Sequence, residues 1–310
     1  MKTVADGRAR RGRALSLGTS EAIRGFLFVL PALVLLGIFV YRPLLETVRL
    51  SFYDWNMVSP TQTYVGWRNY AELWQSPGVR RAVVNTGTYA LWLGALVLVL
   101  PTIATIALTY MRSFWRRLFR VVLFLPNIIS LATASVIWLW IYNPIGGFLA
   151  AVWAALDKFP VNWLSNPRTA LGAVAVIVAW KAFGYNFLLL TAGLAGVPQE
   201  VVEAARVDGA EGWVLWRHIL IPMLGPTIVF VLSATLVMAA EYVFTPVHML
   251  TEGGPINAST NVVFEIWRQA FRWFRVGYSS AIAVCVFLLF LVITTVQMLV
   301  SERVVSYEER

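Results

Sequence analysis

The sequence is poor in charge. Only 13% of its 310 residues are charged, whereas 59% are hydrophobic. A soluble domain carries charge at about a quarter of its positions, so this chain cannot cover itself with polar surface in water. We therefore expect a membrane protein. We attribute its net charge of +9 to arginines on loops that face anionic lipid. Because this accounts for the positive charge, we expect no nucleic-acid partner.

The residues that build common catalytic sites are also scarce. The single cysteine, Cys285, lies inside an apolar run, so no intrachain disulfide can form. None of the three lysines completes a G-x-x-x-x-G-K loop for ATP. The chain has neither an H-E-x-x-H zinc motif nor a G-x-S-x-G nucleophile motif. We expect a protein that is not an enzyme and that binds no metal or cofactor itself.

What the chain does contain is long apolar segments. A spanning helix needs about 20 largely apolar residues. Six segments meet this requirement: 25–45, 82–111, 121–142, 169–194, 226–250 and 279–300. We predict an all-α membrane protein with about six transmembrane helices. Its transmembrane domain would cover 25–303, between a basic arm at 1–24 and a tail at 304–310.

Positive charge predicts the orientation of these helices. Arginines crowd the shortest predicted loop, and basic residues also precede the first helix. With six spans both sets lie on one side, which the positive-inside rule assigns to the cytoplasm. Both termini would then be cytoplasmic. The residues are Lys2, Arg8, Arg10, Arg11, Arg13 and Arg24 in the arm, and Arg112, Arg116, Arg117 and Arg120 in the loop.

The connection at 196–226 has the strongest internal pattern and predicts a helix, a turn and a second helix. Pro198 suits the first helical position. Gly209 suits the left-handed residue after a helix end. Ala204 and Ala205 would form a small-residue face that another backbone can approach closely, so the hairpin is typical of a docking element.

This hairpin resembles the E-A-A loop of permeases from binding-protein-dependent ABC importers. Trp216 stands where that family usually has phenylalanine. The matching residues are Glu203, Ala204, Ala205, Asp208, Gly209, Ala210, Ile219, Pro222 and Pro226.

The resemblance extends over most of the chain. The stretches at 41–43, 65–70, 250–261 and 277–281 are similar to carbohydrate-uptake permeases related to the maltose permease F subunit. Residues 180–188 are similar to the glycerol-3-phosphate permease A subunit. The candidate solute is therefore a sugar or sugar-like molecule, with glycerol-3-phosphate or a related phosphodiester as one example.

The resemblance implies a type I importer fold in a bacterial inner membrane. It also implies four kinds of partner: a second homologous permease, two cytoplasmic ATPase subunits that bind ATP and magnesium, an extracytoplasmic solute-binding protein, and membrane lipid. The ATPase would receive the hairpin, with Glu203 in polar contact and Gly209 permitting the turn. The coupling residues would be Glu203, Ala204, Ala205, Asp208, Gly209 and Ala210.

Two charged residues, Lys181 and Glu241, fall inside predicted spans. A charge at the centre of a span costs about 2.5–3.5 kcal/mol on insertion scales, so both need partners. One hypothesis places them on the translocation path, and another pairs them as a structural lock between helices. Near Pro126, Asn127 and Ser130 would satisfy free backbone groups. The candidate path residues are Lys181, Tyr185, Asn186, Glu241 and Tyr242.

Two other functions compete with an ATP-driven importer. A proton-coupled secondary transporter would use Lys181 and Glu241 as a proton relay. A membrane scaffold would transport nothing. The proton-coupled transporter leaves the pattern of the 196–226 hairpin unexplained.

Overall fold

The computed structural model describes residues 19–305, so the predicted basic arm lies mostly, and the predicted tail almost entirely, outside the described residues. The chain divides between Arg49 and Leu50 into two compact units, which are described separately below. The domain limits predicted at 24 and 303 stay predictions.

The first unit is a helix with one irregular turn. It consists of α1 (Thr19–Leu36), a π-helical turn η1 (Gly37–Tyr41) and α2 (Arg42–Leu50). The 27-residue stretch Arg24–Leu50 is long and apolar enough to span a membrane. The helix predicted at 25–45 is therefore confirmed, and it continues to Leu50.

The second unit is predominantly helical. Its long helices are α4 (Pro77–Thr109), α5 (Ser113–Ile128), α6 (Leu131–Ile141), α8 (Ala170–Ala195), α12 (Gly225–Glu241) and α15 (Val276–Val305). Its short helices are α3 (Arg68–Gln75), α7 (Phe148–Ala155), α9 (Gln199–Val207), α10 (Gly212–Leu215), α11 (Ile221–Met223), α13 (Phe244–Pro246) and α14 (Val262–Trp267). The π-helical turns are η2 (Trp216–Leu220), η3 (Val247–Thr251) and η4 (Arg268–Arg272). Two short antiparallel strands, β1 (Tyr53–Asp54) and β2 (Thr63–Tyr64), place Tyr53 opposite Tyr64.

Four stretches of this unit are long and apolar enough to cross a membrane: Pro77–Thr109, Ala170–Ala195, Gly225–Thr251 and Val276–Leu299. Each overlaps a predicted span. With the first unit and the bent pair described next, the described residues hold five to six candidate spans. The predicted class, an all-α membrane protein with about six spans, is confirmed.

The span predicted at 121–142 is not a single helix. Two helices, α5 and α6, replace it, and they are bent by 101° at a short break. The backbone of Ile129 and Ser130 is extended. The Ser130 hydroxyl accepts a hydrogen bond from the backbone amide of Thr133 at 3.1 Å, and this bond caps α6. A serine at the N-cap position starts a new helix and so interrupts the preceding one. A hydropathy average does not register such a cap. The prediction that Ser130 provides a hydrogen-bond partner for a free backbone group is confirmed.

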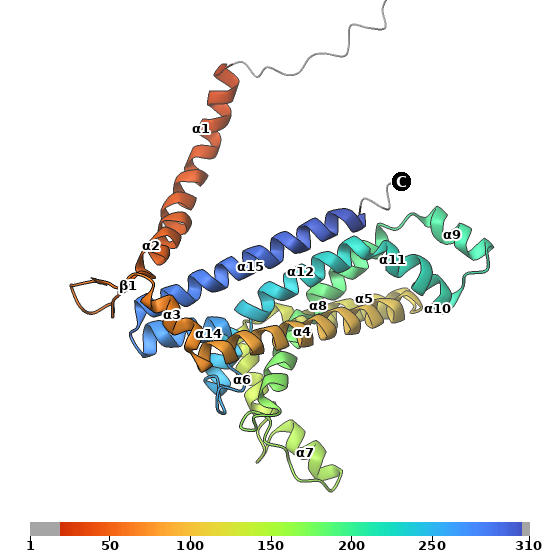
Figure 1. Ribbon diagram of the computed structural model, residues 1–310. Helices are drawn as coiled ribbons and strands as arrows, with labels where there is room; N and C mark the ends of the chain where they lie inside the picture. Colours follow the sequence, from red (N-terminus) through yellow and green to blue (C-terminus); the bar gives the residue numbers. More distant parts are fainter. Residues whose placement is uncertain (1–18, 306–310) are drawn as a thin grey trace, which may run out of the picture. The chain divides into compact units, whose positions relative to one another are not determined.

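Helix α8 is the centre of the second unit. It packs between α4 and α5, while α12 packs on α4 (Figure 1). In its apolar segment, 61% of the residues are buried, against 6% in the corresponding segment of α15. Tyr89, Leu93 and Val97 on α4 meet Val174 and Val178 on α8 in the largest core cluster of the described residues. This core fixes how α4 and α8 lie against each other.

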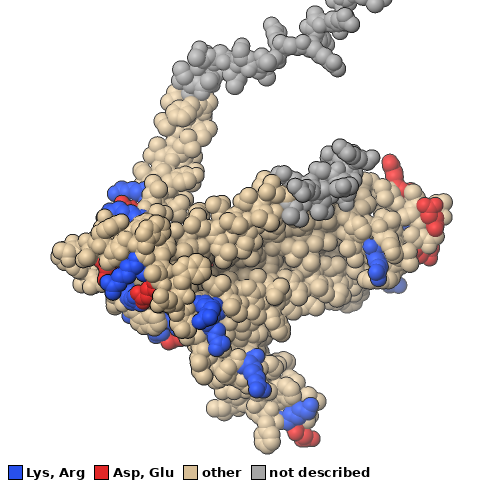
Figure 2. Space-filling view, viewed as in Figure 1, with Lys and Arg blue, Asp and Glu red and all other residues tan. Residues whose placement is uncertain are grey.

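On the face drawn in Figure 2, charged side chains gather toward the ends of this unit. Figure 2 shows Lys, Arg, Asp and Glu near α9, near α3 and α14, and around α7, with an uncharged band between them. An uncharged band flanked by charged ends is the pattern that a bilayer requires.

The loop at 251–261 is held against α4 by buried polar side chains. The Asn85 amide donates to the carbonyls of Asn257, Ala258 and Thr260 at 3.0, 3.2 and 3.0 Å. The Tyr89 hydroxyl donates to Ser259 O at 2.9 Å. Just after this loop, the amide of Val262 donates to the Thr86 hydroxyl at 3.0 Å. Buried backbone groups need such partners, so α4 fixes the loop.

Candidate functional site

The 196–226 hairpin folds as two helical arms around a tight turn. Helix α9 runs from Gln199 to Val207, and α10, η2 and α11 return toward α12. The helix pattern of the sequence is confirmed, with one correction. Pro198 is the residue before the helix rather than its first residue, because its ψ of 130° is not helical. Pro226 lies in the first turn of α12, as predicted.

Gly209 has the left-handed backbone predicted for it. Its φ is +83°, its amide donates to Arg206 O at 3.0 Å, and the amide of Ala210 donates to Ala205 O at 2.9 Å. These two bonds form a Schellman motif, in which the residue after the helix is usually glycine. The turn that reverses the chain is therefore fixed by backbone hydrogen bonds.

The inner face of the hairpin is anchored in the second unit. Ala205, Leu215, Trp216 and Leu220 are buried together, with Ile106 of α4 and Leu194 of α8 packed against them. The indole N–H of Trp216 donates to the Tyr110 hydroxyl at 3.3 Å. The hairpin is thus attached to the ends of three long helices: α4, α8 and α12.

The structure separates the two alanines that the sequence placed on one face. Ala205 is buried against Leu215 and Trp216, whereas Ala204 is exposed. Successive residues on a helix are about 100° apart, so they do not share a face. The predicted small-residue surface is wrong in this respect, and only Ala204 is open to a partner.

The outer face of the hairpin combines charge with exposed apolar side chains. Glu203 is exposed and accepts a hydrogen bond from Gln199 at 3.0 Å, and Asp208 and Gly209 are also exposed. Val207 and Trp213 are 87% and 62% exposed. Large apolar side chains at the tip of a rigid hairpin are typical of an interaction surface.

A cavity of about 460 Å³ lies between the hairpin and the ends of α4 and α8. Gln199, Glu203 and Arg206 line its α9 side, and Thr109 and Tyr110 line the other. Glu203 therefore faces both solvent and the base of the hairpin. The sequence could not show this second environment, because it depends on where the end of α4 lies.

The candidate path residues fall in two environments. Lys181 and Tyr185 are one turn apart on α8 and partly exposed, with Tyr185 at 45%. Glu241 is the last residue of α12, and both Glu241 and Tyr242 are exposed. Asn186 differs from them, because it is 1% exposed and its amide donates to Ala182 O of its own helix at 3.0 Å. In this structure Asn186 belongs to the core rather than to an open surface.

The Lys181–Glu241 lock is not formed. The ammonium of Lys181 donates to the carbonyl of Asn127, at the end of α5, at 3.1 Å. Within residues 19–305 no ion pair joins Lys181 to Glu241. Within residues 19–305 the Asn127 side chain makes no hydrogen bond to a backbone group at this break, contrary to the prediction, and instead the backbone carbonyl of Asn127 accepts from Lys181.

A second cavity of about 770 Å³, which the sequence did not reveal, lies beside the N-terminal end of α8. Trp92, Trp138 and Trp163 line it together with Arg81 and Arg168. The indole nitrogens of Trp138 and Trp163 are buried and have no hydrogen-bond partner within residues 19–305. Aromatic walls with a few polar groups are the usual lining of small-molecule pockets.

Fold and hairpin define a class of protein. The described residues include no group of three or more His, Cys, Asp or Glu side chains arranged to hold a metal. What they do include is a multi-pass helical body that carries a rigid hairpin with an exposed face. This combination describes a multi-pass membrane protein with an exposed hairpin surface.

The family follows from sequence comparison. Residues 98–306, more than half of the chain, match the family of binding-protein-dependent transport system inner membrane components. The chain belongs to this family of ABC transporter permeases, and the resemblance noted in the sequence is confirmed.

Relatives match over most of their length. A probable ABC transporter permease, YurN of Bacillus subtilis, is 34% identical over 88% of this chain and 94% of its own. The sn-glycerol-3-phosphate transport system permease protein UgpA of Brucella abortus is 30% identical over 91% of this chain and 96% of its own.

A solved structure has the same fold. The bacterial alginate ABC transporter, in complex with alginate pentasaccharide-bound periplasmic protein, matches with a TM-score of 0.80 and 21% identity. The match covers 92% of this chain and 96% of that one. The type I permease fold is therefore shown.

Proposed function

We propose that this protein is the permease subunit of an ATP-driven importer for a sugar or sugar-like solute, and that it receives energy through the 196–226 hairpin. The proposal rests on how this hairpin is attached to the long helices of the second unit. Its inner face is anchored to α4, α8 and α12, while Glu203, Val207 and Trp213 stay exposed. A rigid base with an open outer face is what a force-transmitting contact needs.

The hairpin offers two routes for motion into the membrane. One is nearly continuous helix, through η2 and α11 into α12. The other is the contact of Trp216 with Tyr110 at the end of α4. A displacement of α9 by a partner would tilt both helices together, because packed elements move as bodies rather than deform continuously.

The proposal includes partners that supply what this chain lacks. Two cytoplasmic ATPase subunits would bind ATP and magnesium and receive Glu203 and the exposed tip. A second homologous permease would complete the path, and an extracytoplasmic binding protein would deliver the solute. The family description and the alginate transporter bound to its periplasmic protein support this composition. The protein would lie in a bacterial inner membrane with both termini in the cytoplasm.

The solute class rests on residues of the second unit. Lys181 and Tyr185 present a cation and a hydroxyl on one exposed stripe of α8, and Glu241 and Tyr242 present an acid and a second hydroxyl. Such groups suit hydroxylated solutes, and Lys181 suits an anionic one. Glycerol-3-phosphate or a related phosphodiester is our candidate, supported by relatives named sn-glycerol-3-phosphate permeases. No observation favours the proton-coupled alternative, since Lys181 pairs with a carbonyl rather than with Glu241.

The test is Gly209→Pro in the assembled transporter. Proline fixes φ near −65° and has no amide, so it can neither adopt the φ of +83° nor donate to Arg206 O. We expect normal membrane insertion and ATP hydrolysis that no longer drives uptake in proteoliposomes. Gly209→Asn is the matched control, because asparagine tolerates the left-handed conformation. Wild-type uptake by the proline variant would refute the coupling role.

A further inference from the structure

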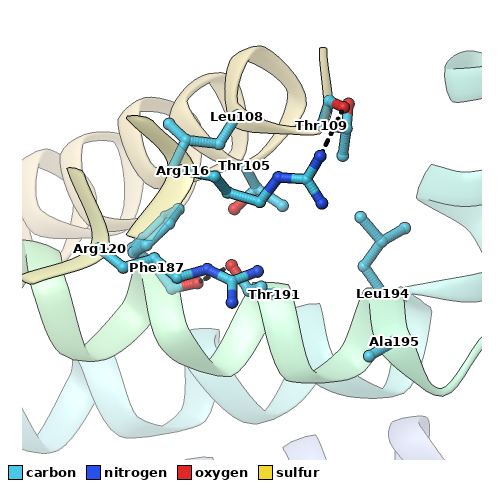
Figure 3. A pocket seen from close by; sticks show the side chains of 9 residues that line it. All are labelled: Thr105, Leu108, Thr109, Arg116, Arg120, Phe187, Thr191, Leu194 and Ala195. Carbon is cyan, nitrogen blue, oxygen red and sulfur yellow. Dashed lines mark hydrogen bonds between the residues drawn. The ribbon is translucent and has the colours of Figure 1, made fainter. Parts of the chain in front are cut away.

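A pocket with two arginines and no acidic residue lies between α4, α5 and α8 (Figure 3). Its volume is about 170 Å³. It is lined by Thr105, Leu108, Thr109, Arg116, Arg120, Phe187, Thr191, Leu194 and Ala195. Three of these also line the cavity under the hairpin, namely Thr109, Leu194 and Ala195. The pocket therefore lies at the same end of the unit as the hairpin.

Within the described residues no acidic side chain pairs with either arginine. Arg116 and Arg120 are one turn apart on α5, a spacing at which like charges repel. Arg116 donates to Met111 O at 3.0 Å, yet its Nε is buried without a partner. Over residues 19–305, Arg120 makes no ion pair. An anion between them would remove the repulsion.

Thr105 is a second, independent pointer to a ligand. Helix α4 has five threonines, and four of them donate to carbonyls of their own helix: Thr86, Thr88, Thr102 and Thr109. Thr105 is 3% exposed, and its hydroxyl has no hydrogen-bond partner among the residues that the structure describes. Figure 3 shows its side chain between those of Arg116 and Arg120. Buried hydroxyls are nearly always hydrogen-bonded, so this one is available to something in the pocket.

We propose that this pocket binds a phosphate group, and that the source of the phosphate is the headgroup of an anionic phospholipid. Guanidinium groups bind phosphate through paired, charge-assisted hydrogen bonds, and the Thr105 hydroxyl would donate one more. The volume equals about six waters at their share of liquid volume, which is room for a phosphate group but not for the two acyl chains of a phospholipid.

The surroundings of the pocket favour lipid as the source. Phe114, Trp115 and Phe119 on the same stretch of α5 are 68%, 51% and 38% exposed. Aromatic side chains of this kind gather at membrane interfaces, so acyl chains would lie along them while the headgroup enters the pocket. On the orientation given by the proposed function, the lipid belongs to the cytoplasmic leaflet, whose anionic lipids attract arginine clusters.

The test measures lipid binding to the full-length protein, purified with the subunits that accompany it and stripped of lipid in detergent. Native mass spectrometry would follow titrations with dioleoyl phosphatidylglycerol, with dioleoyl phosphatidylcholine, and with inorganic phosphate. The variants are Arg120→Gln and Thr105→Val. The matched control is Arg117→Gln, which removes the same charge from the same helix at a residue that does not line the pocket. Unchanged melting temperatures would verify folding.

We expect phosphatidylglycerol to bind more tightly than phosphatidylcholine. Arg120→Gln should weaken this binding about fivefold, Thr105→Val two- to fivefold, and Arg117→Gln less than twofold. Equal losses in Arg120→Gln and Arg117→Gln would overturn the site, because general surface charge would explain them. Unchanged binding in both pocket variants would also overturn it. If inorganic phosphate binds as tightly as the lipid, the phosphate site stands and its assignment to lipid is refuted.

Discussion

The close approach of α5 and α8 depends on one glycine. A Cβ at Gly184 would lie 2.4 Å from Leu123 O and 2.5 Å from the Cα of Phe124. Ordinary contact begins near 3.4 Å, so α5 would have to move by about 1 Å. Both obstacles are backbone atoms, and no side-chain rotation can relieve them. Small residues of this kind are what allow membrane helices to touch.

Gly184→Ala should therefore destabilise the protein. Overpacking costs about 1–3 kcal/mol, and the higher helix propensity of alanine returns about 1 kcal/mol. A net loss of up to about 2 kcal/mol corresponds to a melting temperature lower by up to roughly 8 °C. Lys181 lies one turn before Gly184 and donates to Asn127 at the end of α5, so uptake should fall as well.

A control on the same helix has the opposite expected sign. At Gly172 a Cβ would meet only the Trp92 ring, at 4.0 Å. Gly172→Ala should thus gain helix propensity without a clash and raise the melting temperature by a few degrees. The assay is thermal unfolding of both variants in the same detergent. Equal shifts of the same sign in both variants would refute the reasoning from helix contact.

Two further predictions concern the anchoring of the functional loops. Asn85→Leu removes the amide that serves three loop carbonyls. Each carbonyl left without a partner costs about 1–3 kcal/mol, so backbone amides at 251–261 should exchange hydrogen faster. The control, Thr88→Val on the same helix, should change this exchange little. Equal protection of the loop in both variants would contradict the anchoring role of Asn85. Trp216→Ala should open a cavity costing about 3–5 kcal/mol and make the hairpin sensitive to protease. Trp216→Phe keeps an aromatic ring in the core, so it should lose the bond to Tyr110, about 0.5–1.5 kcal/mol, and leave a smaller cavity than alanine does. A hairpin equally resistant in both Trp216 variants would show that the indole does not anchor it.

Hydropathy predicted most of the helices, because the bilayer imposes a simple rule on composition. The spans predicted at 169–194 and 226–250 became Ala170–Ala195 and Gly225–Thr251. Where the rule failed, another force decided. Helix α5 begins at Ser113, inside the stretch that was predicted to be a loop. Hydropathy missed this start because the arginines lower the average over a helix that also has an apolar face. The break before α6 depends on the Ser130 cap, a single local hydrogen bond.

The hairpin was predictable from local chemistry alone. A glycine directly after a helix favours a left-handed turn, and Gly209 has a φ of +83° in the structure. The two alanines were misplaced, because neighbouring positions in a motif do not share a helix face. Asn85 and Thr105 could not be identified from the sequence. Their roles depend on which distant segment packs beside α4, and no local pattern records that contact.

The burial of α8 bears on the path. A lysine inside a span is costly in lipid, and α8 is mostly buried between α4 and α5. Its exposed stripe nevertheless carries Lys181 and Tyr185, with Leu188 36% exposed beyond them. Lipid does not solvate such a stripe well, and one carbonyl from Asn127 satisfies only one of the three ammonium hydrogens. The remaining donors need water, solute or another chain, which supports a second permease across a shared path.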